Sequence, residues 1–240
     1  MTSTVVPHPA RPVLPGSVPV GSARGGAWWR ALALAEVLLA CVVVVRDLLL
    51  PAAVLVLLAG ASLWVRRERV ASLGLVGPRQ LSRLVPAVLG LSVAWTLLEV
   101  ALVIPVTEHV TGQRQDMAGF AELHGNLGLL VVLLVASWTL AAFVEELAFR
   151  GYLRTRLVDV LGGTPTAAVA ASLVAALMFG LIHTEQGVVG VVLTTVDALF
   201  FTVLARRSAS GLWASVLAHG FNNTIGLVTV FLVGPVYGLW

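Results

Sequence analysis

The sequence predicts an all-α protein, a polytopic membrane helix bundle with about seven transmembrane helices. The first observation is its composition: 58% of the 240 residues are hydrophobic and 11% are charged, whereas soluble domains contain about 25% charged residues. The second observation is that the apolar residues fall into seven stretches. Each is close to the roughly 20 residues that a helix needs to cross a hydrocarbon core. This composition indicates a protein embedded in a lipid bilayer.

The chain divides into a polar start and a long apolar remainder. Residues 1–26 are rich in Pro, Gly and Ser and lack a hydrophobic period, which predicts a disordered cytoplasmic tail. Residues 27–240 are predicted to form a membrane domain. We expect its helices near residues 27–45, 48–65, 84–106, 127–149, 166–183, 188–205 and 210–232.

Arginines separate these helices and predict their orientation. Arg46 stands between the first two helices, and Gly74, Gly77 and Pro78 break the arginine-rich connection to the third. Arginines also follow the fourth and sixth helices, so that thirteen of the fifteen basic residues lie on one side, leaving only Arg46 and Arg114 on the other. Because basic residues stay in the cytoplasm, we expect a multi-pass protein of the cell membrane with a cytoplasmic N-terminus.

The positive charges do not indicate a nucleic-acid partner. The formal net charge is +3, but the basic residues are scattered between apolar stretches and form no basic domain with interleaved aromatic residues. The expected partner is the lipid bilayer. The single cysteine, Cys41, excludes an intrachain disulfide.

Ionisable residues inside a membrane are costly and usually mark function. The acidic residues and histidines within the predicted helices are Glu36, Glu99, Glu145, Glu146, His183, Asp197 and His219. In the segment AAFVEELAFRGYL, Arg150 lies four residues after Glu146, in the favoured direction for a helical ion pair. Glu145 is then left without that partner. The alternative is that both glutamates merely reach the cytoplasmic interface near Arg150.

Two further motifs carry histidines at helical spacing. In FGLIH, Phe179 and His183 are four residues apart, and in HGFNN, His219 and Asn223 are four apart on one face of the last helix. The first motif is also compatible with a polar helix end, and the second with a structural hydrogen bond between helices. Together they indicate a polar site within the bundle.

The depths of these motifs yield a structural expectation. The turn after the fourth helix is centred near Gly163, so Glu145 and His183 fall in nearly the same layer, whereas His219 lies only about nine residues into its helix. The three share a layer only if residues 150–163 project into the cytoplasm. The tip at residues 184–187 should then lie in a polar pocket short of the outer surface.

Glutamate, two histidines and asparagine around a wet pocket indicate a hydrolase. A carboxylate in apolar surroundings can take a proton from water, a histidine can orient that water or protonate the leaving amine, and His with Asn can donate to an oxyanion. No serine stands in these motifs. We expect no metal cofactor; a Glu/His/His set could hold zinc, but the HExxH arrangement is absent.

The order EExxxR, FxxxH, HxxxN, with FRGYL and SVLAHGFNN around it, resembles the CPBP family of CAAX prenyl proteases and bacteriocin-processing enzymes, also called the Abi family. The resemblance covers about residues 126–230. It implies an intramembrane endopeptidase acting on a membrane-associated protein or peptide. It further implies that Glu145 with His183 activates water and that His219 with Asn223 forms the oxyanion site. Supporting residues are Glu146, Arg150 and Phe179. One departure from the family is Asp197, on a helix where relatives commonly contain glycine.

Two alternatives remain open. A non-catalytic protein of the same fold would act as a membrane scaffold, a regulator or a bacteriocin-immunity protein. A transporter or channel would use Glu36, Glu99 and Asp197 along a pathway, but these residues are dispersed over three helices and lack the paired spacing of the later motifs.

Overall fold

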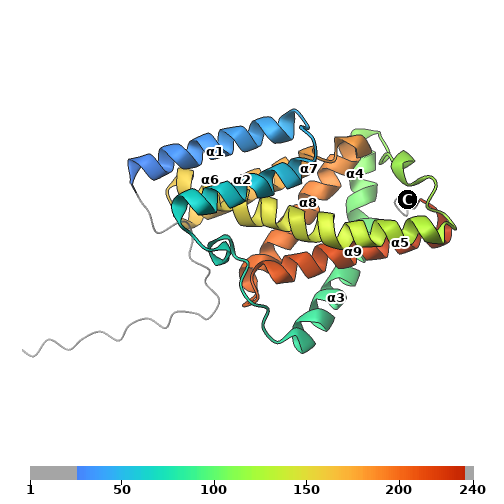
Figure 1. Ribbon diagram of the computed structural model, residues 1–240. Helices are drawn as coiled ribbons and strands as arrows, with labels where there is room; N and C mark the ends of the chain where they lie inside the picture. Colours follow the sequence, from blue (N-terminus) through green and yellow to red (C-terminus); the bar gives the residue numbers. More distant parts are fainter. Residues whose placement is uncertain (1–25, 236–240) are drawn as a thin grey trace, which may run out of the picture.

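A computed structural model describes residues 26–235 of the chain. All regular structure in that range is helical, as the sequence predicts. Of the predicted tail, only Gly26 belongs to the described residues, so its disorder stays a prediction. Figure 1 shows long helices lying side by side, with one helix that diverges from the others.

The first half of the chain forms an antiparallel helix pair and a long bent helix. The pair consists of α1 (Ala27–Val45) and α2 (Pro51–Arg66). After the short η1 (Val70–Leu73), the bent helix runs through α3 (Leu81–Leu98), the π-helical η2 (Glu99–Val103) and α4 (Ile104–Thr111). In Figure 1, α3 points away from the other helices, whereas α4 returns behind them.

The second half supplies the centre of the bundle. Its first helix is continuous through α5 (Leu127–Ala136), η4 (Ser137–Leu153) and α6 (Arg154–Leu161), with the short η3 (Ala118–Phe120) before it. Three further helices follow, α7 (Pro165–Leu181), α8 (Gly187–Arg207) and α9 (Leu212–Val233), with η5 (Thr184–Gln186) between the first two. The element η4 is π-helical over 17 residues, not α-helical as predicted. π-helical segments are rare and are frequently found at functional sites.

Five described helical stretches are long and apolar enough to cross a membrane. They are Ala27–Val45, Leu81–Thr111, Leu127–Leu161, Thr184–Arg207 and Leu212–Val233. The predicted helical membrane fold is therefore confirmed, but the count of about seven spans is not. The other two predicted spans, 48–65 and 166–183, form shorter apolar helices of 16 and 17 residues.

The central helix packs on both halves of the bundle. Its η4 part contacts α2 and α9, while α6 contacts α1 and α7, and α7 packs along α8. Thr164 is the N-cap of α7: its hydroxyl accepts a hydrogen bond from the backbone N–H of Ala167 at 3.1 Å. Pro165 is the first residue of the helix. Its small residues are buried, which lets neighbouring helices approach: Ala167, Ala168, Ala171, Ser172, Ala175 and Ala176.

The central helix extends past the start of α9, as the depth comparison predicts. Gly151 faces the side chain of Leu212, the first residue of α9, and the helix then continues to Leu161. However, this extension does not project freely. Leu157 and Val158 are buried, and α6 lies against α1 and α7. Helix α1 of the α1–α2 pair therefore packs against α6, which the sequence predicts to project into the cytoplasm.

A buried ion-pair network links α1, α2 and α6. Glu36 of α1 lies 3.1 Å from Arg66 of α2 and 3.4 Å from Arg156 of α6. Arg156 also contacts Glu68 at 3.0 Å and Asp159 at 2.8 Å. Both arginines are fully buried. Because breaking a buried ion pair is strongly destabilising, Glu36 has a structural explanation and is not needed as a pathway residue.

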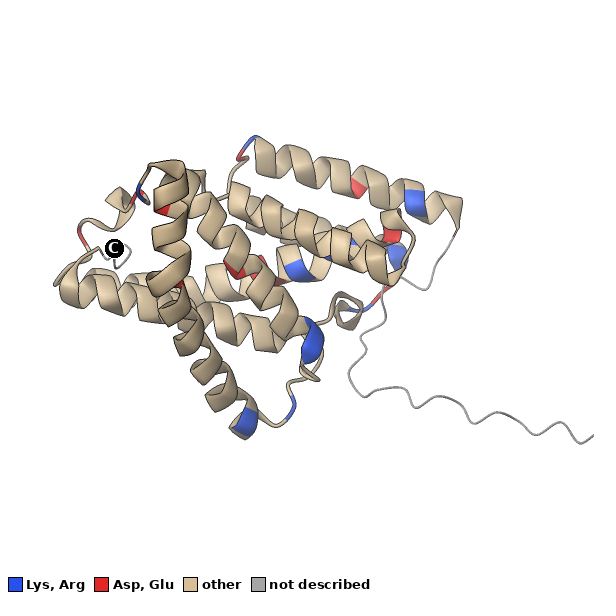
Figure 2. Cartoon of the chain, turned by 180° about the vertical axis from the view of Figure 1, so that it is seen from behind, with Lys and Arg blue, Asp and Glu red and all other residues tan. Residues whose placement is uncertain are grey.

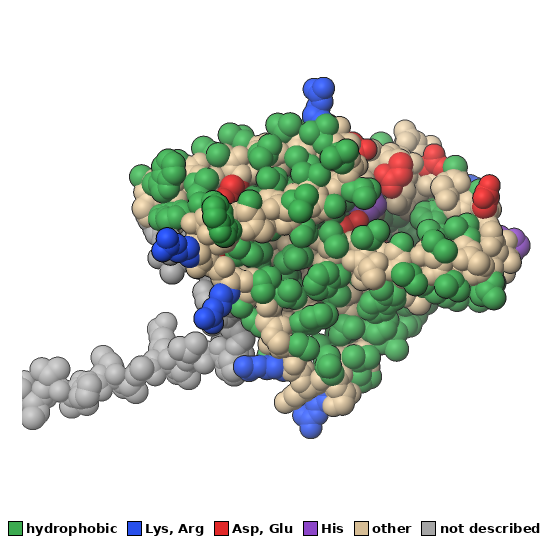
Figure 3. Space-filling view, in the orientation of Figure 1, with side chains coloured by type: hydrophobic (Ala, Val, Ile, Leu, Met, Phe, Trp, Pro, Cys, Tyr) green, Lys and Arg blue, Asp and Glu red, His purple; other side chains and the backbone are tan. Residues whose placement is uncertain are grey.

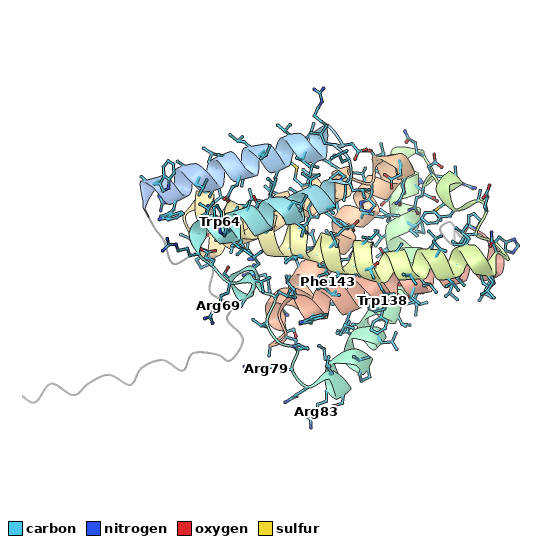
Figure 4. The ribbon with its side chains drawn as sticks, viewed as in Figure 1. Trp64, Arg69, Arg79, Arg83, Trp138 and Phe143 are labelled. Carbon is cyan, nitrogen blue, oxygen red and sulfur yellow. The ribbon has the colours of Figure 1, made fainter. Side chains whose placement is uncertain are left out.

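Basic residues gather toward the end of the molecule where α1 begins (Figure 2). Arg69 and Arg79 lie along the connection between α2 and α3, and Arg83 lies in the first turn of α3 (Figure 4). This connection is fixed to the start of α9: the N–H of Arg79 donates to Ser210 Oγ at 2.9 Å. The distribution agrees with a single arginine-rich side, and the cytoplasmic placement of that side stays a prediction.

Gly220 permits a close contact between α9 and the central helix. A Cβ atom at this position would come within 2.5 Å of the Trp138 ring, so we expect Gly220→Ala to lower the free energy of unfolding by about 1–3 kcal/mol. Gly226, on the same helix, has no atom within 4 Å of such a Cβ. Gly226→Ala is therefore expected to be neutral or stabilising by about 0.5–1 kcal/mol. Thermal unfolding of both variants in detergent would compare them; equal midpoints would contradict this account.

Candidate active site

A cavity of about 520 Å³ lies between the bent helix, the central helix, α8 and α9. Its walls are largely apolar, and its polar lining residues include Glu99, Ser137, Glu145, His183, Gln186, Asp197, His219, Asn222 and Asn223. Figure 3 shows acidic and histidine side chains around a hollow in an otherwise hydrophobic face. Cavities of this kind, apolar with a few convergent polar groups, are the usual setting of ligand sites.

The structure brings the predicted residues together. Glu145, Phe179, His183, His219 and Asn223 all line this cavity, although they come from the central helix, α7, the turn after it and α9. The two remaining predicted residues lie directly behind the lining. They are Glu146 and Arg150, whose contacts reach the lining through His219 and Phe179.

Glu146 and Arg150 form the predicted pair, and His219 joins it. Arg150 Nη1 lies 3.1 Å from Glu146 Oε1. His219 Nδ1 lies 3.0 Å from the same oxygen, so that an Nδ1–H donates to the carboxylate. All three side chains are buried. His219 is thus hydrogen-bonded to Glu146, which the sequence predicts to pair with Arg150 alone.

Aromatic rings fix the positions of Arg150 and the histidines. The Arg150 guanidinium lies 4.1 Å from the centre of the Phe179 ring, a cation–π contact. The same ring packs against His183 at 4.9 Å and against His219 at 5.8 Å, and Phe201 stacks on His219 at 4.9 Å. Phe179 therefore has a central supporting position.

Glu145 faces the cavity with little local pairing. Its Oε2 atom lies 3.9 Å from His219 Nε2 and has no hydrogen-bond partner among the described residues. Its side chain is 17% exposed, whereas that of Glu146 is fully buried. Of the two adjacent glutamates, Glu145 is the one that a water molecule or substrate in the cavity can reach.

A backbone contact orients His183. Its Nδ1 lies 3.0 Å from the carbonyl oxygen of Phe179, which can only accept, so Nδ1 carries the proton. In the neutral ring, Nε2 is then an acceptor. A ring held in this way can accept a hydrogen bond from water in the cavity.

Two further carboxyl groups line the cavity, and sequence reasoning did not pair them. Glu99 of η2 lies within side-chain hydrogen-bonding reach of Asp197 of α8. Trp95 Nε1 donates to Asp197 Oδ1 at 2.7 Å, and Asn222 Nδ2 lies 3.4 Å from the same oxygen. Glu36, Glu99 and Asp197 do lie on three separate helices, but Glu99 and Asp197 come together across two of them. Because 98 positions separate them, no local spacing reveals the contact.

The loop at residues 112–126 contributes to the lining of the cavity. Gln115 Nε2 donates to Gln186 Oε1 at 2.9 Å, and the N–H of Asp116 donates to the carbonyl of Gln186 at 3.0 Å. Gln115, Met117 and Gln186 are lining residues. Gln186 of the tip between α7 and α8 thus lines the cavity, whereas Thr184 and Glu185 are exposed. The predicted position of the whole tip in a polar pocket short of the outer surface stays a prediction. Local sequence patterns do not indicate the contribution of this loop.

Possible metal ligands in the lining do not form a group of three. Among the described residues, no three His, Cys, Asp or Glu side chains come together closely enough to hold a metal ion. Nδ1 of His183 and Nδ1 of His219 are each directed at an oxygen of the protein, which leaves Nε2 of both rings for other partners. The expectation that the protein needs no metal stays a prediction.

Comparison with protein families identifies one match within this region. Residues 127–225 match the family described as type II CAAX prenyl endopeptidase Rce1-like. The match contains every motif residue and supports the CPBP relationship that the motifs predict. No curated protein and no solved structure matches the chain.

Proposed function

From this family match as the premise, we propose that the chain is an intramembrane endopeptidase that hydrolyses a peptide bond of a membrane-associated protein or peptide. The family supports a CAAX-type intramembrane protease in general terms. The observation that carries the finer proposal is the convergence of Glu145, His183, His219 and Asn223 on one cavity. A site of hydrolysis inside a membrane protein needs such a cavity to hold water away from lipid.

Glu145 acts as the general base in this proposal. Its partly exposed carboxylate takes a proton from a water molecule whose second proton is held by Nε2 of His183. The resulting hydroxide attacks the scissile carbonyl carbon, and the proton on Glu145 passes to the leaving amine. The support for these roles is the accessibility of Glu145 and the orientation of His183 by Phe179.

His219 and Asn223 stabilise the tetrahedral oxyanion in this proposal. Asn223 contributes its side-chain N–H, and His219 contributes an Nε2–H when its ring carries both protons. Glu146 accepts the Nδ1–H and thereby orients the ring. Arg150 in turn neutralises Glu146. The supporting pair thereby keeps His219 oriented and ready to donate.

A comparison of cellular membrane proteins would test the function before any substrate is identified. We expect one or more membrane-associated proteins to accumulate uncleaved in cells that carry Glu145→Ala and to be processed in wild-type cells. Glu122→Ala, at an exposed position in the loop outside the cavity lining, is the control. Identical profiles for all three strains would favour a non-catalytic scaffold or regulator.

Metal removal supplies a further prediction. Because no three possible metal ligands come together among the described residues, we expect the purified protein to retain its peptidase activity after exhaustive treatment with EDTA and 1,10-phenanthroline. Cleavage of a reporter peptide in detergent, before and after dialysis, measures this. Activity that disappears and returns only when zinc is added would overturn the glutamate-based mechanism.

A further inference from the structure

The lining of the cavity has an unbalanced charge. It includes three carboxyl residues, Glu99, Glu145 and Asp197, and no arginine, and the chain contains no lysine. The proposed mechanism uses only Glu145. Arg150 lies behind the lining and is already paired with Glu146. The cavity therefore presents two more acidic groups than the chemistry requires.

Glu99 and Asp197 are held close together in a fixed geometry. Trp95 and Asn222 both direct side-chain N–H groups at Asp197 Oδ1, and Trp95 stacks in parallel on Phe200 with 4.5 Å between the ring centres. Two carboxylates that lie side by side in apolar surroundings repel one another. A positively charged ligand between them would offset that repulsion.

Two further polar groups in the lining are unsatisfied. Asn222 turns its Nδ2 toward Asp197, while its Oδ1 atom is buried without a hydrogen-bond partner in the described range. The hydroxyl of Ser137 also has no partner there, and this residue is only 6% exposed. A buried polar group without a partner is unfavourable. Both can accept a hydrogen bond, and both line the same cavity.

We propose that Glu99 and Asp197 form a specificity subsite that binds a cationic side chain, the guanidinium of arginine or the ammonium of lysine, in the substrate. The inference rests on the proposed peptidase function, whose cavity it shares. A guanidinium or ammonium group supplies both the charge that the carboxylates need and the N–H donors that Asn222 Oδ1 lacks. In apolar surroundings, this charge-assisted contact is favourable only when the cationic group of the substrate lies next to the two carboxylates.

The subsite also discriminates against other substrates. A substrate carboxylate in the cavity would meet Glu99 and Asp197 as like charges, which is unfavourable. A neutral side chain would leave the acceptors unsatisfied. The substrate class that fits is thus a membrane-associated peptide with a basic residue within a few positions of the scissile bond.

Binding of a small cation tests the subsite independently of catalysis. The probe is benzamidine, and its neutral isostere benzamide is the control, each added to the full chain in detergent. We expect benzamidine to raise the melting temperature of the wild type and of Glu145→Ala, and benzamide to leave it unchanged. Glu99→Gln and Asp197→Asn should each lose most of the benzamidine shift. Glu122→Gln, outside the lining, should keep it.

The outcomes separate the subsite from the function. Equal shifts with both probes, or a full benzamidine shift in Glu99→Gln and Asp197→Asn, would overturn the subsite even if the protein cleaves peptides. A specific benzamidine shift without any cleavage would leave the subsite intact and sink the proposed function. With an active enzyme, Asp197→Asn should lower kcat/KM about tenfold or more for a peptide that contains arginine but not for its citrulline analogue. An equal loss for both peptides would indicate a merely structural pair.

Discussion

Replacement of Glu145 by glutamine is expected to lower peptide-bond cleavage by about 10²- to 10⁴-fold, the contribution typical of a general base. Glutamine keeps the shape and the hydrogen-bonding capacity of the side chain but cannot take a proton from water. Because Glu145 Oε2 has no hydrogen-bond partner among the described residues, the substitution breaks no such bond and should leave folding intact. Single-turnover cleavage of a reporter peptide in detergent is the measurement.

His183→Ala should have a loss of similar order, since the proposal gives it the same water molecule. Glu185→Gln, two residues further along in the exposed tip, is its control and should retain activity. Unchanged turnover in Glu145→Gln, with an equal amount of folded protein, would refute the assignment of the base. A large loss in Glu185→Gln would point instead to the shape of the tip.

Removal of Arg150 is expected to have the largest effect on stability. Arg150→Ala removes the arginine that pairs with the fully buried Glu146, and breaking a buried pair in this way costs about 3–5 kcal/mol. It also removes the guanidinium from the Phe179 ring. We expect little or no folded protein, as measured by size-exclusion chromatography and thermal unfolding in detergent.

Two further variants separate the effect of the buried charges on stability from that of side-chain packing. Arg154→Ala lies one turn further on and loses a single side-chain hydrogen bond to Ser172, so it should cost about 1 kcal/mol. The double variant Glu146→Gln/Arg150→Met lacks both buried charges of this pair and should recover most of the folded protein. It should nevertheless be poorly active, because His219 loses the carboxylate that holds its proton. Full stability of Arg150→Ala would contradict the importance of this pair.

Local spacing predicted those parts of the site that lie on one helix. The pairing of Glu146 with Arg150 and the shared face of Phe179 and His183 both follow from residues four apart, and both contacts are present. The pair forms even though this stretch is π-helical. The freedom of Glu145 from Arg150 follows from the same spacing.

Contacts between helices were not predictable from spacing. The bond from His219 to Glu146, the approach of Glu99 to Asp197 and the bond from Gln115 to Gln186 each join segments far apart in the sequence. They depend on how the helices are rotated against one another, which hydrophobic periodicity does not encode in chains that are apolar on all sides. The depth comparison assumed the rise of an α-helix, whereas the stretch that contains Glu145 is π-helical.

The two short helices have a consequence for the surrounding lipid. With 16 and 17 residues, α2 and α7 extend over about 24 Å and 26 Å, less than the roughly 30 Å of hydrocarbon in a typical bilayer. A short hydrophobic helix is accommodated by local thinning of the bilayer, at a cost that grows with the mismatch. Helix α7 ends two residues before His183, which lines the cavity. The cavity therefore lies next to the end of a helix that is shorter than a typical hydrocarbon core.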